Sequence, residues 1–383
     1  MPSLSTLTIL AGALVSSVLA DVTPLSDRRY TYPNGLPYKV DTDATGRGPQ
    51  AGYNICNSTT EGQSSMCQTA LLNSIEDFCV WASPTPNSSI GDVEATTVAW
   101  CSIPGHGTRV MPAGTLTGVQ VLKAPSYILF TGHLKQTNVG IAANDDGGEL
   151  DPHGADERGN PLGGLVYTSG FPSNGGRDNT FQQVIEWHNF MGGDVFCFKI
   201  CDPNVPNSKK YCNNIFDRTG CDFVAPAAYK DGVFEVCESD NMDPVGVYTG
   251  SDGKTSTYHQ PAEGVPITSL PSIKTPASSS CTPYQSNALY GNSFTISPSA
   301  PPSGTGTSTA SGTTSTKATT TSQSTSTVTS LATSTTHAAT TPSTTSTTTT
   351  SKTGGASAIA FNGVATIFSA SVLAGLVAAV IAL

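Results

Sequence analysis

The sequence is short of charged residues and of the motifs by which most enzyme classes are recognised. Only 12% of its 383 residues are Asp, Glu, Lys or Arg. It has no G-x-S-x-G and no C-x-x-C pair, so neither an esterase of the usual hydrolase fold nor a zinc site of that kind is indicated. Up to Glu263 there are 15 basic and 28 acidic residues, a formal charge of 15 − 28 = −13. This excess disfavours binding to nucleic acids and to anionic lipids.

The C-terminal 20 residues, 364–383, contain no charge, and no basic residue follows them to stop membrane transfer. Small residues and a short spacer precede this apolar tail, which is the pattern of a glycosylphosphatidylinositol (GPI) attachment signal. The alternative is a tail-anchored helix. We therefore predict a GPI signal over 354–383, with the lipid as the protein's only contact with the membrane. The predicted attachment residue is Gly355, with Gly354, Ser357 and Asn362 as competitors.

The N-terminal segment 1–20 has an apolar run that is shorter than the about 20 residues needed to span a bilayer. It ends in Val18-Leu19-Ala20, a small-x-small pattern typical of signal-peptide cleavage. A membrane anchor or a buried helix is the alternative. We expect a secreted protein that begins at Asp21 and is held on the outer face of the plasma membrane or attached to the cell wall.

Segment 301–353 has almost no aliphatic or aromatic side chains and consists mainly of Ser, Thr, Gly and Ala. Such a segment cannot bury enough apolar surface to fold, and in a secreted protein it is typical of an O-glycosylated stalk. A bare flexible linker is the alternative. Asn57 and Asn87 each begin an N-x-[ST] sequon, which predicts N-glycosylation on exposed loops.

Ten cysteines in a secreted chain predict five disulfides. Four occur early and five late, and Cys281 stands apart, so at least one late cysteine must pair outside its group if all ten pair. Cys281 is the obvious partner, and the rest of the connectivity stays open. Zinc binding by the group from Cys197 to Cys221 is the rival interpretation. The ten are Cys56, Cys67, Cys79, Cys101, Cys197, Cys201, Cys212, Cys221, Cys237 and Cys281.

The remaining body, 21–300, is predicted to be a mainly β ectodomain with one early α-helix. Apolar residues at helical spacing place that helix over 65–81. Short runs rich in β-branched residues and bounded by Gly, Pro or Asn predict strands in the later part of the body. These runs are 116–125, 126–134, 137–144, 194–201, 232–237 and 245–250.

The densest group of polar residues lies in the Gly- and Pro-rich segment 144–164. Paired carboxylates there, Glu149 with Asp151 or Asp156, have the chemistry of a glycoside hydrolase. The same oxygens suit Ca²⁺, although the spacing is not that of an EF-hand. His153 with Asp151 is a candidate catalytic or metal-binding dyad. The competing interpretation is a solvated acidic loop whose side chains cap their own turns.

Four long stretches of the body together resemble the fungal macrophage-activating glycoproteins, which are cell-surface glycoproteins mainly of basidiomycetes. The resemblance covers roughly residues 30–250, and the order of leader, cysteine-rich body, Ser/Thr stalk and anchor signal also fits. It implies no catalytic residue, cofactor or metal. The stretches are 59–92, 100–120, 147–164 and 211–250.

These observations together predict a fungal surface or cell-wall glycoprotein with a structural or interaction role. An enzyme is the less favoured interpretation, and no cofactor is expected. The alternative function is that of a carbohydrate-active protein that binds or cleaves wall polysaccharide through the acidic loop at 145–158. Wall polysaccharides or other surface glycans are the expected partners.

Overall fold

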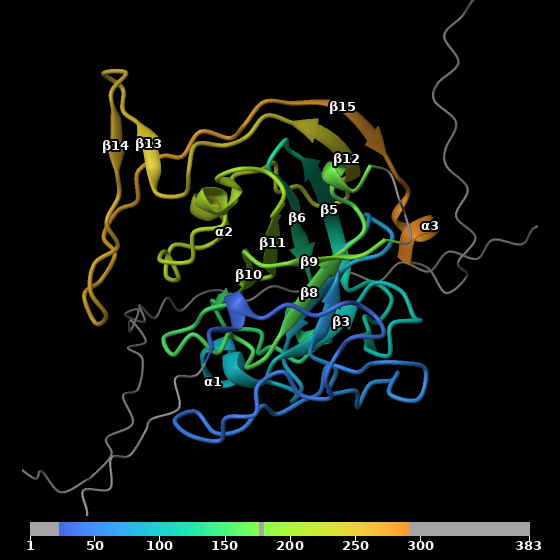
Figure 1. Ribbon diagram of the computed structural model, residues 1–383. Helices are drawn as coiled ribbons and strands as arrows, with labels where there is room; N and C mark the ends of the chain where they lie inside the picture. Colours follow the sequence, from blue (N-terminus) through green and yellow to red (C-terminus); the bar gives the residue numbers. More distant parts are fainter. Residues whose placement is uncertain (1–22, 176–179, 291–383) are drawn as a thin grey trace, which may run out of the picture. The chain divides into compact units, whose positions relative to one another are not determined.

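The computed structural model describes residues 23–175 and 180–290. A seven-stranded sheet is its largest element, and its neighbours are antiparallel except for β12 and β5, which run parallel (Figure 1). Its strands, in spatial order, are β15 (Ser278–Pro283), β12 (Phe234–Ser239), β5 (Leu116–Lys123), β6 (Tyr127–Leu134), β11 (Val195–Cys201), β10 (Trp187–Gly192) and β7 (Gly148–Leu150).

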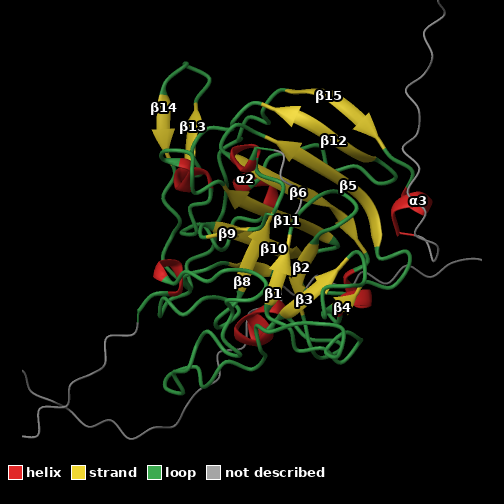
Figure 2. Cartoon of the chain, turned by 45° about the vertical axis from the view of Figure 1, so that its right-hand side comes forward, coloured by secondary structure: helices red, strands yellow, loops and turns green. Residues whose placement is uncertain are grey.

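Two three-stranded sheets and one hairpin complete the β structure (Figure 2). They are β1 (Thr69–Leu71), β8 (Leu165–Thr168) and β9 (Gln182–Val184); β2 (Cys79–Ala82), β3 (Val98–Cys101) and β4 (Arg109–Val110); and the hairpin of β13 (Val247–Thr249) and β14 (Thr255–Thr257).

The helices that the structure describes are all short. The α-helices are α1 (Ile90–Val93), α2 (Cys221–Val224) and α3 (Ser286–Tyr290). The 3₁₀ turns are η1 (Leu25–Asp27), η2 (Glu94–Thr96), η3 (Gln136–Val139), η4 (Pro172–Asn174) and η5 (Ser208–Tyr211). The chain is therefore mainly β, as predicted.

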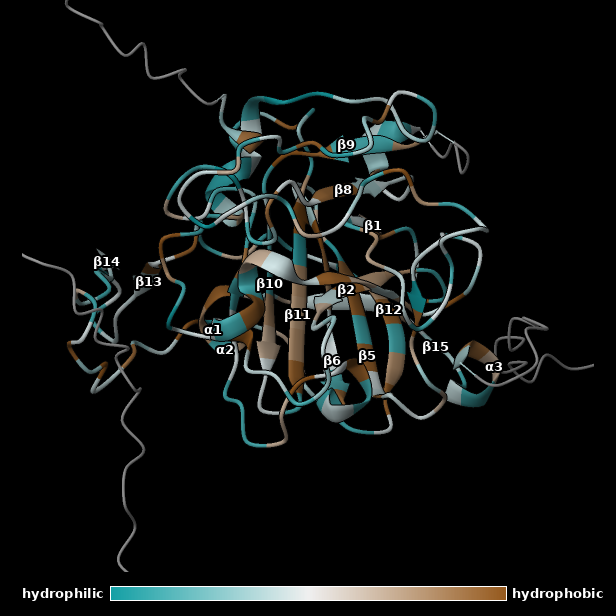
Figure 3. Ribbon diagram, turned by 90° about the horizontal axis from the view of Figure 1, so that it is seen from below, coloured by the Kyte–Doolittle hydropathy of each residue, from teal (hydrophilic) through white to brown (hydrophobic). Residues whose placement is uncertain are grey.

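The central strands of the large sheet are buried on both faces, which explains why they read as nearly continuous apolar runs. In β11, Phe196, Phe198 and Ile200 face one core, and Cys197 and Cys201 face another, so the side chains of this strand alternate between the two faces of the sheet. In Figure 3 the central strands are coloured hydrophobic along much of their length.

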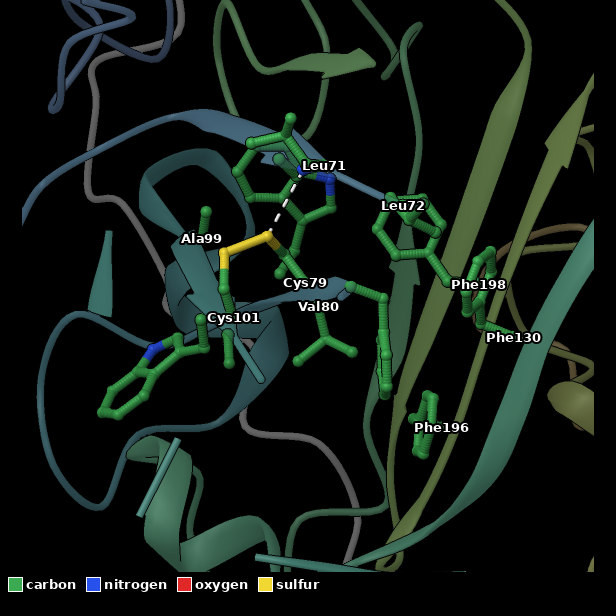
Figure 4. Close-up of a cluster of buried hydrophobic side chains, with 14 of the residues drawn as sticks. Leu71, Leu72, Cys79, Val80, Ala99, Cys101, Phe130, Phe196 and Phe198 are labelled. Carbon is green, nitrogen blue, oxygen red and sulfur yellow. Dashed lines mark hydrogen bonds between the residues drawn. A yellow bond between two sulfur atoms is a disulfide. The ribbon is translucent and has the colours of Figure 1, made fainter. Parts of the chain in front are cut away.

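The first core lies between the large sheet and the two smaller sheets. Phe78, after β1, packs against Phe130 of β6 and Phe196 of β11, with ring centroids 5.4 and 5.9 Å apart. The Cys79–Cys101 disulfide joins β2 to β3 beside these rings, and Leu71 N–H points to Cys79 Sγ at 3.3 Å (Figure 4). The second core covers the opposite face of the sheet with the segment 211–225, which includes α2.

Two predictions of local structure are wrong. The segment 65–81 is not a helix, because it forms β1, a turn and the start of β2, with Asn73 N–H donating to Asp77 O at 2.9 Å in the turn. The early α-helix is instead α1. The segment 137–144 is not a strand either: most of η3 falls there, and it is followed by Gly140 at φ 83°. The other predicted strands are present as β5, β6, β11, β12 and β13.

Candidate functional site

The acidic segment begins on a buried strand and continues as a closed loop. Glu149 lies in the middle of β7, at the edge of the large sheet, opposite Phe190 of β10. Asp151 and Asn160 exchange backbone hydrogen bonds of 3.0 and 2.8 Å, which close the loop between them. The candidate residues of this segment therefore differ in their surroundings.

Glu149 is sealed in the protein and has no hydrogen-bond partner on either carboxyl oxygen. Its nearest polar neighbour is His188 of β10, whose Nδ1 lies 3.8 Å from Oε1 and whose ring nitrogens are also unpartnered. Burial, with repulsion from Asp151 and Asp217, raises the pKa of Glu149 well above its usual value. Burial, with repulsion from Lys199, lowers the pKa of His188. Burial therefore favours the neutral form of both groups.

Lys199 continues this row on the next strand, since it is paired with His188 across β10 and β11. It is fully buried, donates to the carbonyl of Val224, lies 2.8 Å from Met242 Sδ and stands 5.1 Å from the Tyr127 ring centroid. Burial lowers its pKa well below the usual value. The sequence analysis did not single out Lys199. A lysine inside the apolar run of β11 is unusual, and this signal could have identified it.

Asp151 holds its own turn together. Its Oδ1 accepts hydrogen bonds from the backbone N–H of His153 and Gly154, at 2.7 and 2.8 Å, and from Asn214 Nδ2 at 3.1 Å. Burial raises its pKa in spite of these hydrogen bonds, which act in the opposite direction. It is therefore a capping residue, as the competing interpretation of the loop predicted.

His153 is a cross-link, and its ring does not face Asp151. Nε2 lies 3.0 Å from Glu186 Oε2 and Nδ1 lies 2.9 Å from Glu157 Oε2. The hydrogen bond to Glu186, which outweighs the opposing effect of burial, and that to Glu157 raise the pKa of His153 to about 9. An imidazolium thus ties the loop to the segment before β10, and the predicted His153–Asp151 dyad is not formed.

Two arginines bind the same loop to the N-terminal segment. Arg47 forms an ion pair with Asp156 at 2.5 Å. Partial burial of Asp156 acts to raise its pKa, but the hydrogen bond and the charge of Arg47 outweigh this effect and lower the pKa. Arg158, 3% exposed, donates to Asp41 at 2.7 Å and to the carbonyls of Thr45, Asp43 and Gly48.

The candidate residues therefore do not line one open cleft. Glu149 is inside the sheet, Asp151 caps a turn, and His153 and Asp156 form ion pairs. A glycoside hydrolase needs an acid and a second carboxylate that both reach the substrate, and Glu149 and Asp151 are 5% exposed each. Trp187, beside His188, is 1% exposed and belongs to the core, so it offers no face to a sugar.

All ten cysteines are disulfide-bonded. Cys281 pairs with Cys237, so the expected bond between Cys281 and the late group is confirmed, and zinc binding by that group is wrong. Among the described residues, one set of three possible metal ligands converges, Glu235 with Cys237 and Cys281, and both its sulfurs are in the disulfide. The other pairs are Cys56–Cys67, Cys79–Cys101, Cys197–Cys221 and Cys201–Cys212.

Both sequon asparagines, Asn57 and Asn87, are exposed. Asn57 Oδ1 accepts hydrogen bonds from the N–H and the hydroxyl of Thr59, at 2.9 and 2.7 Å. The leader, the Ser/Thr stalk and the four candidate attachment residues, Gly354, Gly355, Ser357 and Asn362, lie outside the described residues. Within 23–175 and 180–290, no helix has the length and apolar character needed to cross a membrane.

Two curated proteins of the fungus Mycosarcoma maydis are similar to this chain. Appressorium protein ROW1 is 42% identical over 236 residues, which are 62% of this chain and about half, 52%, of ROW1. Appressorium protein ROW2 is 37% identical over 285 residues, which are 69% of this chain and 91% of ROW2. No protein-family model and no solved structure matches the chain significantly. Because the similarity spans nearly all of ROW2, the chain belongs to the family of fungal appressorium proteins that includes ROW1 and ROW2.

Proposed function

We propose that this protein is a secreted, GPI-anchored glycoprotein of the fungal cell surface or wall, with a structural or interaction role. The observation that carries the proposal is the pairing of all ten cysteines in five disulfides. Such bonds persist in oxidising surroundings and are rare in the cytosol. The leader, the two sequons, the Ser/Thr stalk and the uncharged tail support the same location from the sequence.

The relatives' names extend the proposal to the development of fungal infection structures. Both similar proteins are named as appressorium proteins. The narrower resemblance to macrophage-activating glycoproteins agrees with a glycosylated surface protein, but the relatives carry a different name. We propose that the ectodomain acts by contact with wall polysaccharide or other surface glycans, and that catalysis is no part of this role.

The anchor is tested with the full chain, tagged after Asp21 and expressed in a fungal host. We expect the protein in the membrane and wall fractions, with release from membranes by a phospholipase that cleaves GPI lipids. A variant that ends at residue 353 is the control and is expected in the medium. Full-length protein that resists the phospholipase and yields no wall-linked fraction would exclude the anchor.

The alternative function, cleavage of wall polysaccharide through the acidic loop, is tested on the same protein. We would incubate it with fungal glucans, chitin and mannan and measure new reducing ends. The control is the double variant Glu149→Gln, Asp151→Asn. Because Glu149 is sealed and Asp151 caps a turn, we expect no new reducing ends. Reducing ends that disappear in the variant would make the protein an enzyme.

A further inference from the structure

A depression of 340 Å³ lies between the N-terminal segment and the edge of the β1–β8–β9 sheet, and none of the acidic loop residues described above is among its lining residues. Its volume falls within the roughly 300–1,000 Å³ range of small-molecule sites. Both polar and apolar side chains line it. The lining residues include Arg29, Tyr30, Gln182, Ile185, Pro203 and Asn204.

The walls of this depression are fixed by the fold. Gln183 of β9 accepts a hydrogen bond from Tyr30 N–H at 2.7 Å and donates to Arg28 O at 3.0 Å, so one carboxamide clamps the N-terminal segment to the sheet edge. Leu25, 3% exposed, holds the start of the same segment in a small core with Tyr167 and Leu165. The site is therefore largely pre-formed, which lowers the entropic cost of binding a ligand.

Arg29 has unused hydrogen-bonding capacity at the depression. Arg29 donates from Nη1 to the carbonyls of Ser26 and Arg28, at 2.7 and 3.1 Å. Nε and Nη2 of Arg29 make no hydrogen bond or ion pair with the part of the chain that the structure describes. This Nε–Nη2 edge is the one that grips a carboxylate with two parallel hydrogen bonds.

Within residues 23–175 and 180–290, Arg29 has no counter-ion at the depression. Among these described residues, no Asp or Glu lines it. Two carboxylates are next to lining residues in the sequence. Glu186 binds His153, and Asp202 Oδ1 accepts from Asn204 N–H at 2.9 Å, while Asp202 Oδ2 is buried without a hydrogen-bond partner. In a body with a formal charge of −13, Arg29 thus presents an unused guanidinium edge at a pre-formed pocket.

We propose that this depression binds a hexuronate residue of an acidic polysaccharide. The carboxylate of the sugar pairs with the Nε–Nη2 edge of Arg29. Ile185 and Pro203 contact the C–H face of the ring. The proposal names a ligand class for the surface role proposed above, but it concerns a different site from the acidic loop.

The test measures binding of a hexameric oligogalacturonate to the full chain, purified in detergent, by titration calorimetry at low and high salt. Its methyl ester, which masks the carboxylates, and neutral cellohexaose are the comparison ligands. We expect the acid to bind, and the ester and the neutral oligomer to bind at least about tenfold more weakly, since a charged hydrogen bond contributes about 1.5–3 kcal/mol. Binding should weaken with salt.

Arg29→Gln is expected to weaken binding of the acid about tenfold or more. Lys254→Gln is the matched control, because it removes one positive charge from a side chain that is 84% exposed and distant in the sequence. It should change the affinity less than about twofold.

The comparison of acid with ester needs no variant, so it holds even if a variant does not fold. Equal binding of acid and ester, unchanged binding by Arg29→Gln, or no binding of the acid would each overturn the proposal. Because binding is measured in solution, this result is independent of the anchor experiment.

Discussion

Glu149, His188 and Lys199 form a row of ionisable side chains across three neighbouring strands of the large sheet. Each is fully buried, and burial disfavours the charged form of each. A hydrophobic layer that includes Val224 and Met242 covers the lysine. A strongly shifted pKa often marks an active site. Here Glu149 and His188 are 5% and 0% exposed, so the row is a feature of the core.

The sequence identified Glu149 as a candidate but could not show that it is buried. Gly147 and Gly148 are typical of a loop, and nothing local reveals that the next residues pair with β10, whose residues 189–191 lie far along the chain, at the edge of the large sheet. The capping role of Asp151 was predictable, because Asp in a Gly- and Pro-rich loop commonly accepts hydrogen bonds from its own turn. The ion pairs of His153 with Glu186 and of Asp156 with Arg47 join distant segments and were not predictable.

At the residue scale, we predict that His153 makes stability depend on pH. Its folded pKa is about 9, above its usual value of 6.5. A raised folded pKa contributes stability that is fully present below about pH 6.5 and is lost as the pH rises through about 9. His153→Gln should therefore cost about 1–3 kcal/mol of unfolding free energy at pH 6 and much less at pH 9.5. Urea unfolding of both proteins at the two pH values measures this.

The control for His153 is His133→Gln. His133 pairs with Asp231, whose side chain is 74% exposed, so the solvent screens this ion pair. The difference between that variant and the parent protein should stay within about 0.5 kcal/mol at both pH values. A cost of His153→Gln that is equal at pH 6 and pH 9.5 would contradict the assigned cross-link.

At the scale of elements, the edge strand β7 reaches the sheet only because two glycines meet. A Cβ added at Gly192, at the end of β10, would lie 2.2 Å from Gly147 Cα, just before β7. The next two residues, Gly193 and Asp194, have φ of 61° and 59°. Positive φ at both centres is typical of the two-residue type I′ turn, which here joins β10 to β11.

We predict that Gly192→Ala destabilises the protein by about 3 kcal/mol or more, because the new methyl group overlaps backbone that cannot give way. Gly193→Ala is the matched control. Its φ is also positive, but a Cβ there has no atom within 4 Å, so only the conformational cost of about 1–2 kcal/mol remains. Thermal unfolding of the two variants measures how much stability each substitution removes. Equal losses of stability in the two variants would show that the contact between Gly192 and Gly147 is unimportant.

Element prediction worked where the sequence pattern and the tertiary environment agreed. The strands β5, β6 and β11 are long runs of β-branched and aromatic residues between turn residues, and they were predicted. The segment 65–81 failed because Leu71, Leu72, Ile75 and Phe78 satisfy helical spacing, while all four are buried by two strands and a turn. The turn at Asn73 and the pairing of β1 with β8 outweigh a weak helical pattern.

At the scale of the whole molecule, the C-terminal end of the described chain is strapped across the first core. Leu289 is 2% exposed, and the Tyr290 hydroxyl donates to Ile75 O at 2.6 Å. The strand before them, β15, is exposed along its whole length and pairs with β12 alone. The Cys237–Cys281 disulfide fixes this edge strand to the sheet and closes a loop of 44 residues. In the proposed anchored protein, the disulfide joins the stalk side of the chain to β12, the strand next to this edge of the sheet.

We predict that replacing Cys237 and Cys281 by Ala lowers the unfolding free energy by about 4 kcal/mol, the loop-closure value for 44 residues. It should also expose the segment 240–285 to proteases while the rest of the sheet stays protected, because hydrogen bonds alone then hold β15.

The control is the removal of the Cys56–Cys67 disulfide. Its separation of 11 residues predicts a loss of about 3 kcal/mol and no new cleavage in 240–285. Limited proteolysis with mass spectrometry distinguishes the two variants. Cleavage spread evenly over the body in the Cys237, Cys281 variant would mean that this disulfide supports the whole fold, and the strap would then be no separate element.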